Sequence, residues 1–302
     1  MSKLRKLLPV VVGLIVLIAG AWLIYRDRSE LADAYGTVGI RVLLFSGLLG
    51  LLGTMCIEQV WLQLLRGLGG SATGRQAAGV FFVSQLGKYL PGSVWPMVAQ
   101  IQFGRRVGVA RRTMLAANLL MLVVITATGL LAAAALLPWA AREGMNGLGW
   151  VFLLLLPLAA FLHPRAVPGL IDVGLRVVHR PPLGLRVDGR RMRLAVGWGV
   201  LCWLLLGGHL LLMTRALGAG GLDSAGAAVG GMGLAFAAGL IFIPAPAGAG
   251  LREAVLVATF SPDIGAINAL AVALASRVLL IVADVVLAAG GYAASRSAQR
   301  DQ

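Results

Sequence analysis

Acidic residues, cysteines and long polar stretches are all scarce in this 302-residue chain. Asp and Glu number 12 against 26 Lys and Arg, a net charge of +14, yet charged residues make up only 13% of the chain. So little charge excludes an ordinary soluble domain. The basic excess does not indicate nucleic-acid binding, because the cations form short clusters between apolar runs and no soluble basic face.

The two cysteines show no sign of covalent or metal chemistry. Cys56 and Cys202 both fall inside apolar runs and lack the spacing of a metal site. We expect both to be small buried residues. The chain also lacks a Gly-rich phosphate loop, a His-Glu-x-x-His motif and paired catalytic carboxylates on a soluble segment. The sequence therefore predicts no enzyme, no cofactor and no metal site.

Apolar residues dominate instead, at 59% of the chain. Their runs predict an all-α polytopic integral membrane protein with about six full spans in a single membrane domain, residues 1–302. The predicted spans are Leu7–Tyr25, Val38–Leu65, Thr113–Leu137, Leu148–His163, Leu194–Thr214 and Ala266–Tyr292. A cleaved signal peptide is the alternative for the first run, which is longer than the usual core of ~7–15 residues.

Basic residues indicate the orientation, because cytoplasmic segments of membrane proteins are enriched in Lys and Arg. With the amino terminus inside, most cations fall in the predicted cytoplasmic segments, among them Arg66, Arg75, Arg106 and Arg190. The predicted outer segments hold only Arg26, Arg28, Arg142 and Arg215. We therefore expect a multi-pass plasma-membrane protein with both termini in the cytoplasm.

The run at residues 76–103 does not fit a simple crossing. Cations on both sides place both of its ends in the cytoplasm, but two crossings need roughly 40 residues. The sequence predicts a re-entrant hairpin that turns at Pro91 and Gly92. Irregular backbone at membrane depth is tolerated only where it is buried in protein or lines a wet cavity, which points to transport.

A second such run, residues 224–262, begins and ends on the outer side in this topology. Its predicted hinge residues are Pro244, Pro246, Gly248 and Gly250. Residues 38–137 and 194–292 then share one plan, span–hairpin–span, in opposite orientations. Inverted repeats with Pro/Gly-interrupted segments at matching positions are typical of transporters whose site lies near the midplane.

Three further segments complete the predicted layout. Residues 1–37 hold the first span and an outer loop, residues 138–193 a linking span and a basic cytoplasmic loop, and residues 293–302 a cytoplasmic tail. Within the loop, Arg165–Arg193 is partly amphipathic. It either lies on anionic lipid or is an ordinary basic loop, and the sequence favours the second reading.

Charged side chains at membrane depth are costly and are usually functional or paired. The candidate substrate-binding residues are Lys88, Arg252, Glu253, Glu58, Arg277 and Asp284. Three cations and three carboxylates suit a buried polar cavity or internal ion pairs. Arg277 and Asp284 are two turns apart on one helical face. We expect His209, inside the fifth span, to hydrogen-bond to a neighbouring helix.

Lys88 and Arg252 are the candidate phosphate ligands. Lys88 lies just before Pro91 at the predicted hairpin tip, although a long side chain there can also extend to the cytoplasmic interface. Arg252 begins the half-helix after the second break, where the helix N-terminus favours anions and a guanidinium binds them with two bonds. Glu253 points elsewhere, so we expect it to serve another partner, such as Arg277.

Two segments carry a resemblance to a known family. Residues 85–95 (QLGKYLPGSVW) and 246–254 (PAGAGLREA) resemble the signature segments of the lysylphosphatidylglycerol synthase/flippase membrane region, which occurs in the multiple peptide resistance factor. Ala247 replaces a usual glycine. The resemblance covers nearly the whole chain and implies a lipid-translocating domain. In that factor a soluble aminoacyl-transferase domain follows; these residues hold none, so synthase activity is not expected.

These observations predict a flippase that moves a phospholipid or a polyprenyl-phosphate-linked headgroup across the membrane. The expected partner is a membrane lipid with a phosphate-containing headgroup, not nucleic acid. The main alternative is a non-transporting scaffold for a separate lipid-modifying transferase, either a glycosyltransferase or an aminoacyl-transferase. A membrane-embedded transferase is a third reading, disfavoured by the missing catalytic residues. The sequence favours no particular oligomeric state.

Overall fold

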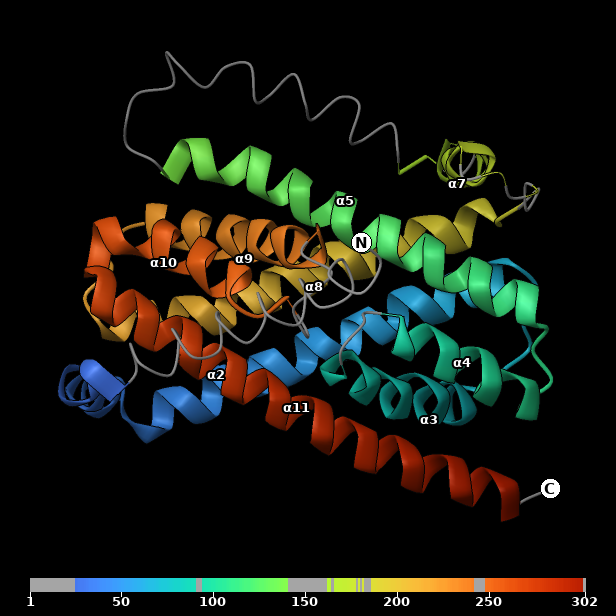
Figure 1. Ribbon diagram of the computed structural model, residues 1–302, viewed down its shortest axis with the longest axis horizontal. Helices are drawn as coiled ribbons and strands as arrows, with labels where there is room; N and C mark the ends of the chain where they lie inside the picture. Colours follow the sequence, from blue (N-terminus) through green and yellow to red (C-terminus); the bar gives the residue numbers. More distant parts are fainter. Residues whose placement is uncertain are drawn as a thin grey trace, which may run out of the picture.

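The computed structural model describes residues 25–90, 94–140, 166–177, 186–241 and 248–300, with a few single positions between 162 and 181. Within these ranges every regular element is a helix, which confirms the predicted all-α class there (Figure 1). The elements are α2 (Arg28–Gly67), α3 (Gly74–Gln85), the 3-10 helix η1 (Leu86–Tyr89), α4 (Trp95–Arg106), α5 (Arg111–Ala140), α7 (Ala166–Val177), α8 (Gly189–Ala216), α9 (Asp223–Ile241), α10 (Leu251–Ile264) and α11 (Ala266–Arg300).

Four of these helices, α2, α5, α8 and α11, are long and apolar enough to cross a membrane. They contain the predicted spans Val38–Leu65, Thr113–Leu137, Leu194–Thr214 and Ala266–Tyr292. The predicted spans Leu7–Tyr25 and Leu148–His163 lie almost entirely outside the described residues. The described part of the chain is thus a helical bundle with the length and composition of a membrane protein.

The helices extend beyond the apolar runs that predicted them. Helix α2 begins at Arg28 rather than near Val38, and its backbone leaves the helical conformation at Gly39 (φ 71°). Helix α11 continues to Arg300. Hydropathy marks the part of a helix that faces lipid, whereas polar residues such as Glu30 continue the helix into water. The boundaries were therefore the least accurate part of the span prediction.

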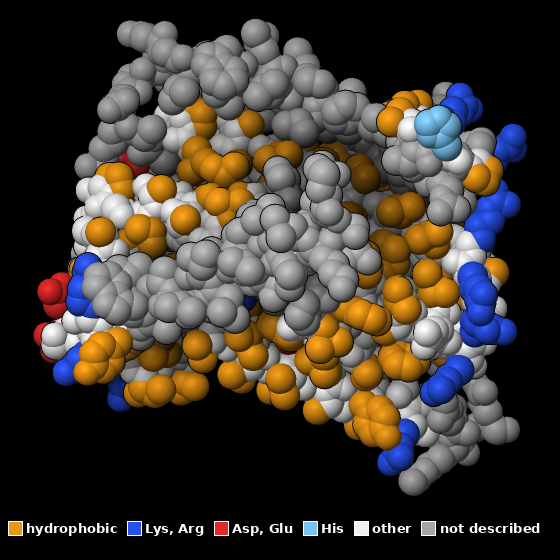
Figure 2. Space-filling model, viewed as in Figure 1, with side chains coloured by type: hydrophobic (Ala, Val, Ile, Leu, Met, Phe, Trp, Pro, Cys, Tyr) orange, Lys and Arg blue, Asp and Glu red, His pale blue; other side chains and the backbone are white. Residues whose placement is uncertain are grey.

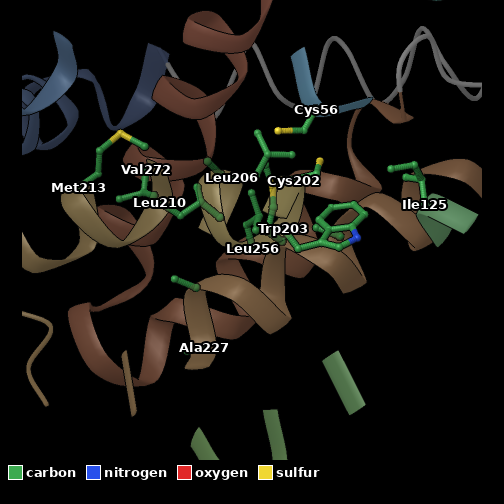
Figure 3. Close-up of a cluster of buried hydrophobic side chains, with 14 of the residues drawn as sticks. Cys56, Ile125, Cys202, Trp203, Leu206, Leu210, Met213, Ala227, Leu256 and Val272 are labelled. Carbon is green, nitrogen blue, oxygen red and sulfur yellow. The ribbon is translucent and has the colours of Figure 1, made fainter. Parts of the chain in front are cut away.

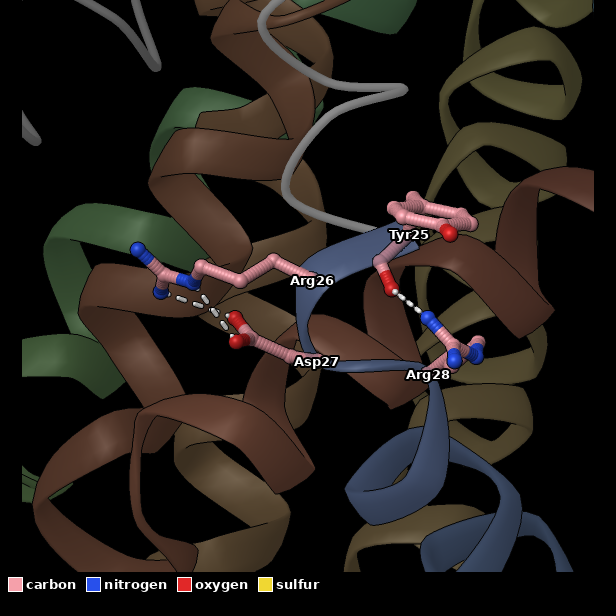
Figure 4. Close-up of polar contacts among 4 residues, drawn as sticks. All are labelled: Tyr25, Arg26, Asp27 and Arg28. Atoms are coloured by element: carbon pink, nitrogen blue, oxygen red, sulfur yellow. Dashed lines mark hydrogen bonds and ion pairs between the residues drawn. The ribbon is translucent and has the colours of Figure 1, made fainter.

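The chain enters α2 through a local ion pair (Figure 4). The Arg26 guanidinium donates to both carboxylate oxygens of Asp27, at 2.7 and 2.9 Å, and Arg28 donates to the Tyr25 carbonyl oxygen at 3.2 Å. The hydrogen bonds from Arg26 lower the pKa of the Asp27 carboxyl. Asp27 therefore stays ionised beside the first turn of α2, where negative charge is favourable.

The long helices pack in a reciprocal pattern. Helices α2 and α8 lie along each other at the centre, and the Asp188 N–H donates to the Gly67 carbonyl oxygen at 3.1 Å where α8 begins and α2 ends. Around this pair α5 packs along α9, and α11 packs along α3. The third helix of each predicted unit thus packs on the first half of the other unit's broken segment.

Three helices of the broken segments, α3, α4 and α10, are short, whereas α9 has 19 residues. Helices α3 and α4 have 12 residues each, about 18 Å at 1.5 Å per residue, and they pack on each other. Helix α10 has 14 residues, about 21 Å, and packs on α9. A bilayer core is about 30 Å thick. In Figure 1, α3 and α4 occupy the half of the molecule that holds the C-terminus, and α9 and α10 occupy the other half.

Glycines allow two of these helix pairs to approach closely. A Cβ atom on Gly291 of α11 would lie 2.8 Å from the Ala78 carbonyl oxygen of α3. A Cβ atom on Gly233 of α9 would lie 2.4 Å from the Gly129 carbonyl oxygen of α5. Small residues at helix contacts are the usual means of tight packing in membranes.

The buried core centres on Trp203, which is 1% exposed and hydrogen-bonds through its indole N–H to the Thr128 hydroxyl at 3.0 Å. Cys56 and Cys202 lie in the same apolar cluster (Figure 3). Both thiols are buried and free, which confirms the prediction that they are small core residues.

The outer surface separates by chemical type. Figure 2 shows hydrophobic side chains across the middle of the molecule and Lys and Arg side chains along the end that holds the C-terminus. Exposed apolar residues lie on the outward faces of α2, α8 and α11; they include Leu44, Phe45, Leu48, Val200, Leu204, Val278, Val282 and Val285. Apolar faces of this extent suit a lipid environment.

Candidate functional site

A narrow cavity of about 80 Å³ lies where the two broken segments meet α2, α8 and α11. Its charged and phenolic lining comes from Lys88 and Tyr89 of η1, Arg252 of α10, and Arg277 and Asp284 of α11. Its remaining lining is Thr54, Ile57, Trp203, Leu206, Met232, Phe236, Leu280 and Ile281. Lys88 and Arg252, the two predicted phosphate ligands, thus line one cavity.

Asp284 holds the first broken segment to α11. The Lys88 ammonium lies 2.7 Å from the Asp284 carboxylate, whose side chain is only 3% exposed. The Tyr89 hydroxyl donates to the same carboxylate. Lys88 therefore turns toward α11 in this conformation.

The η1 turn places these two side chains. It sits directly against the start of α4, where a Cβ atom on Gly87 would lie 3.1 Å from the Pro96 nitrogen. Only a residue without a side chain fits there comfortably. The predicted hinge residues Pro91 and Gly92 lie outside the described residues.

Glu253 holds the second broken segment to the same helix. Its carboxylate pairs with Arg277, which confirms the predicted partner, and accepts the Gly250 backbone N–H at 2.6 Å. Gly248 and Gly250 have φ values of 69° and 88°, a backbone conformation that favours glycine. These two predicted hinge residues therefore mark a sharp change of direction at the start of α10. The other two, Pro244 and Pro246, lie outside the described residues.

Arg252 stands apart from both ion pairs. Among the described residues, its guanidinium has no carboxylate within ion-pair distance, so it forms no ion pair with Glu253 or Asp284. Its contact is a weak one, from Nη2 to the Met232 sulfur at 3.5 Å. A guanidinium that lies among apolar side chains without a carboxylate partner favours the binding of an anion.

Glu58 does not line the cavity. It is 4% exposed, accepts a hydrogen bond from the Gln59 amide at 2.8 Å, and lies one turn along α2 from Thr54, which does line it. Within the described part of the chain no cation lies within ion-pair distance of Glu58. The structure thus brings five of the six candidate residues to one place and leaves Glu58 beside it.

His209 is a brace between helices, as predicted. Its ring nitrogens lie 2.7 Å from the Ser46 hydroxyl of α2 and 2.9 Å from the Ser276 hydroxyl of α11. Ser276 precedes Arg277 in the chain, so this brace fixes the turn of α11 that carries the guanidinium.

A larger, open depression of about 450 Å³ lies near the start of α2 and the junction of α10 with α11, lined in part by Glu30 and Asp33. Both carboxylates are exposed. Its described lining includes neither η1 nor the start of α10 and no buried charge, so the site is not assigned to it. Within the described ranges no group of three His, Cys, Asp or Glu side chains is arranged to hold a metal ion.

The sequence does not single out several residues of the cavity lining. Tyr89 adjoins Lys88 in the first signature segment, and this position was its only signal. The aromatic wall of Trp203 and Phe236, whose ring centroids are 5.3 Å apart, and Met232 look like any other apolar residues of a span. Their position in the cavity lining follows from the packing of the helices alone.

Comparisons with protein-family models and with curated proteins give no match for this chain. The resemblance to the lysylphosphatidylglycerol synthase/flippase membrane region rests on the two quoted segments and is taken up below as a proposal.

Proposed function

We propose that this chain is a lipid flippase: a transporter that moves the phosphate-containing headgroup of a membrane lipid across the plasma membrane while the tails stay in the bilayer. The observation that carries the proposal is that Lys88 and Arg252, from two different broken segments, line one cavity with Arg277 and Asp284. Charges at membrane depth mark substrate pathways.

The architecture we propose has about six full spans and two re-entrant hairpins in an inverted repeat. The shortness of α3, α4 and α10 supports the hairpins, since each is shorter than a bilayer core. The reciprocal packing of α5 on α9 and α11 on α3 supports the repeat. The cations at the C-terminal end support a cytoplasmic location for the C-terminus. Such repeats place the site at their interface.

The observed conformation suits a closed state of such a transporter. Small-molecule sites usually measure about 300–1,000 Å³, whereas this cavity measures about 80 Å³. Two ion pairs close it, Lys88–Asp284 and Arg277–Glu253. A phosphate can replace either carboxylate as the partner of a cation, so headgroup entry and ion-pair opening are coupled in this proposal.

The resemblance fits this proposal. The two signature segments hold Lys88, Tyr89, Arg252 and Glu253, and all four contribute to the cavity or to its ion pairs. We propose that the chain is a member of the lysylphosphatidylglycerol synthase/flippase membrane region without transferase activity. The scaffold alternative requires no such cavity.

Reconstitution tests the function. The purified chain in liposomes with tail-labelled fluorescent phospholipids should make inner-leaflet label accessible to an added quencher faster than protein-free liposomes do. Lys88→Ala and Arg252→Ala should each slow this at least about tenfold, because a charge-assisted bond is worth about 1.5–3 kcal/mol.

Arg296→Ala is the matched control. Arg296 is an exposed cation on α11 that stacks on Tyr292 and lies outside the cavity, so its loss should leave the rate unchanged. Absence of transport by correctly folded wild-type protein would reject the flippase and favour the scaffold.

A further inference from the structure

Resting on the proposed function, we infer that the cavity selects a headgroup with a single negative charge, a phosphodiester, and that Arg252 is the residue that determines this selectivity. Headgroups with two negative charges, or with equal numbers of both signs, fit the site less well. The inference follows from the charges at the cavity and from the way they are paired.

Among the described residues, five charged side chains set the charge at the site. In each of the two ion pairs, Lys88–Asp284 and Arg277–Glu253, the positive and negative charges cancel. Arg252 is left over, with a methionine sulfur as its contact at 3.5 Å. The described residues of the cavity and its ion pairs therefore carry one uncompensated positive charge.

The chain segments at the two breaks leave this balance unaltered. Residues 91–93 are Pro, Gly and Ser, and residues 242–247 contain only Phe, Ile, Pro and Ala. None of these side chains is ionisable. His209 is engaged by two serine hydroxyls, and Glu58 lies outside the lining.

The geometry of a phosphodiester matches what Arg252 offers. The group has one negative charge shared over two non-bridging oxygens, and a guanidinium binds such a pair with two parallel hydrogen bonds. A bound phosphodiester would neutralise the charge of the site, and both ion pairs could re-form after it enters. A phosphomonoester, whose second pKa is near 6, brings surplus negative charge beside Asp284. A zwitterionic headgroup brings a cation into a site that already has one too many.

Substitutions should shift the preference in opposite directions. Arg252→Gln removes the surplus charge and should abolish the preference for a monoanion. Arg252→Lys keeps the positive charge but loses the two parallel hydrogen bonds of the guanidinium. The preference for a monoanionic headgroup should therefore remain while transport slows. Asp284→Asn adds one positive charge and should favour the phosphomonoester.

The experiment compares three probes in the liposome assay: labelled phosphatidylglycerol, phosphatidic acid and phosphatidylcholine. We expect phosphatidylglycerol to move at least about tenfold faster than the other two, equivalent to about 1.4 kcal/mol. Equal rates for all three would overturn the selectivity while leaving the flippase intact.

A binding measurement keeps the inference testable if no lipid moves. Soluble dihexanoyl forms of the three lipids are titrated against the purified full-length protein, and melting temperature is recorded. Stabilisation by the phosphatidylglycerol form alone, lost in Arg252→Gln, upholds the inference even where transport fails. Equal stabilisation by all three forms, or by none, rejects it.

Discussion

Asp284 receives two donors from neighbouring residues of one short turn, the Lys88 ammonium and the Tyr89 hydroxyl. Its carboxylate is almost fully buried, so each donor offsets part of the cost of removing a charge from water. Lys88 is different because its side chain is one-third exposed, at 33%. Leaving the Asp284 carboxylate unpaired therefore costs more free energy than leaving the Lys88 ammonium unpaired.

The double-mutant test of this pair follows directly. Lys88→Met should destabilise the protein by an amount at the low end of about 3–5 kcal/mol, because it leaves a buried carboxylate with Tyr89 alone. Adding Asp284→Asn should restore most of the stability lost in Lys88→Met. Melting temperatures of the single and double variants in one detergent measure this. A double variant no more stable than Lys88→Met would assign the loss to packing of the lysine stem.

Among the elements, α11 shows how closely two membrane helices can pack. Gly290 and Gly291 are adjacent, yet their surroundings differ completely. No atom lies within 4 Å of a Cβ placed on the exposed Gly290, whereas one on Gly291 would lie 2.8 Å from the Ala78 carbonyl oxygen of α3. The contact between α11 and α3 therefore depends on Gly291 and also on Gly79 of α3, where a Cβ atom would lie 3.0 Å from the Gly291 carbonyl oxygen.

These two glycines form a matched pair of variants. Gly291→Ala should destabilise by about 1–3 kcal/mol, because the backbones of α11 and α3 must separate. Gly290→Ala should be neutral or stabilise by up to about 1 kcal/mol, since alanine is the better helix former. Thermal melting of both variants measures the difference. Equal effects would mean that the glycines act through helix propensity alone.

The long elements could be predicted from the sequence because each depends on local composition. Apolar runs bounded by arginines located α2, α5, α8 and α11, and Pro/Gly clusters located the breaks. The partners of the charged residues were harder. Lys88 and Asp284 are far apart in the chain, and their contact depends on how α3 packs against α11, which no local pattern encodes. The Glu253–Arg277 pair was predicted because few carboxylates and cations were available at membrane depth.

At the scale of the whole molecule, charge is distributed by end. The cations at the ends of α2 and α4 and at the starts of α3, α5 and α8 share one end with the C-terminus. The opposite end carries residues of both signs. In a membrane, this asymmetry sets the orientation.

Single introduced cysteines test that orientation. Replacements of Glu30 and Asp263 should react with an impermeant thiol reagent on intact cells, whereas replacements of Arg75, Arg106 and Arg190 should react only after permeabilisation. All five positions are exposed, and the native Cys56 and Cys202 are buried, so background labelling should be low. External labelling at Arg106 would make the first broken segment a full crossing and reject the inverted repeat.

One continuous helix carries the partners of both broken segments. Arg277 and Asp284 lie about 10.5 Å apart along the axis of α11, so a rotation of that helix that withdraws one from its partner also withdraws the other. For the proposed transporter, the cavity then opens in one concerted event with one activation barrier. A bound headgroup lowers that barrier by offering a replacement anion, while the empty carrier stays shut. Such a protein can redistribute lipid while the empty carrier gives ions no open path through the site.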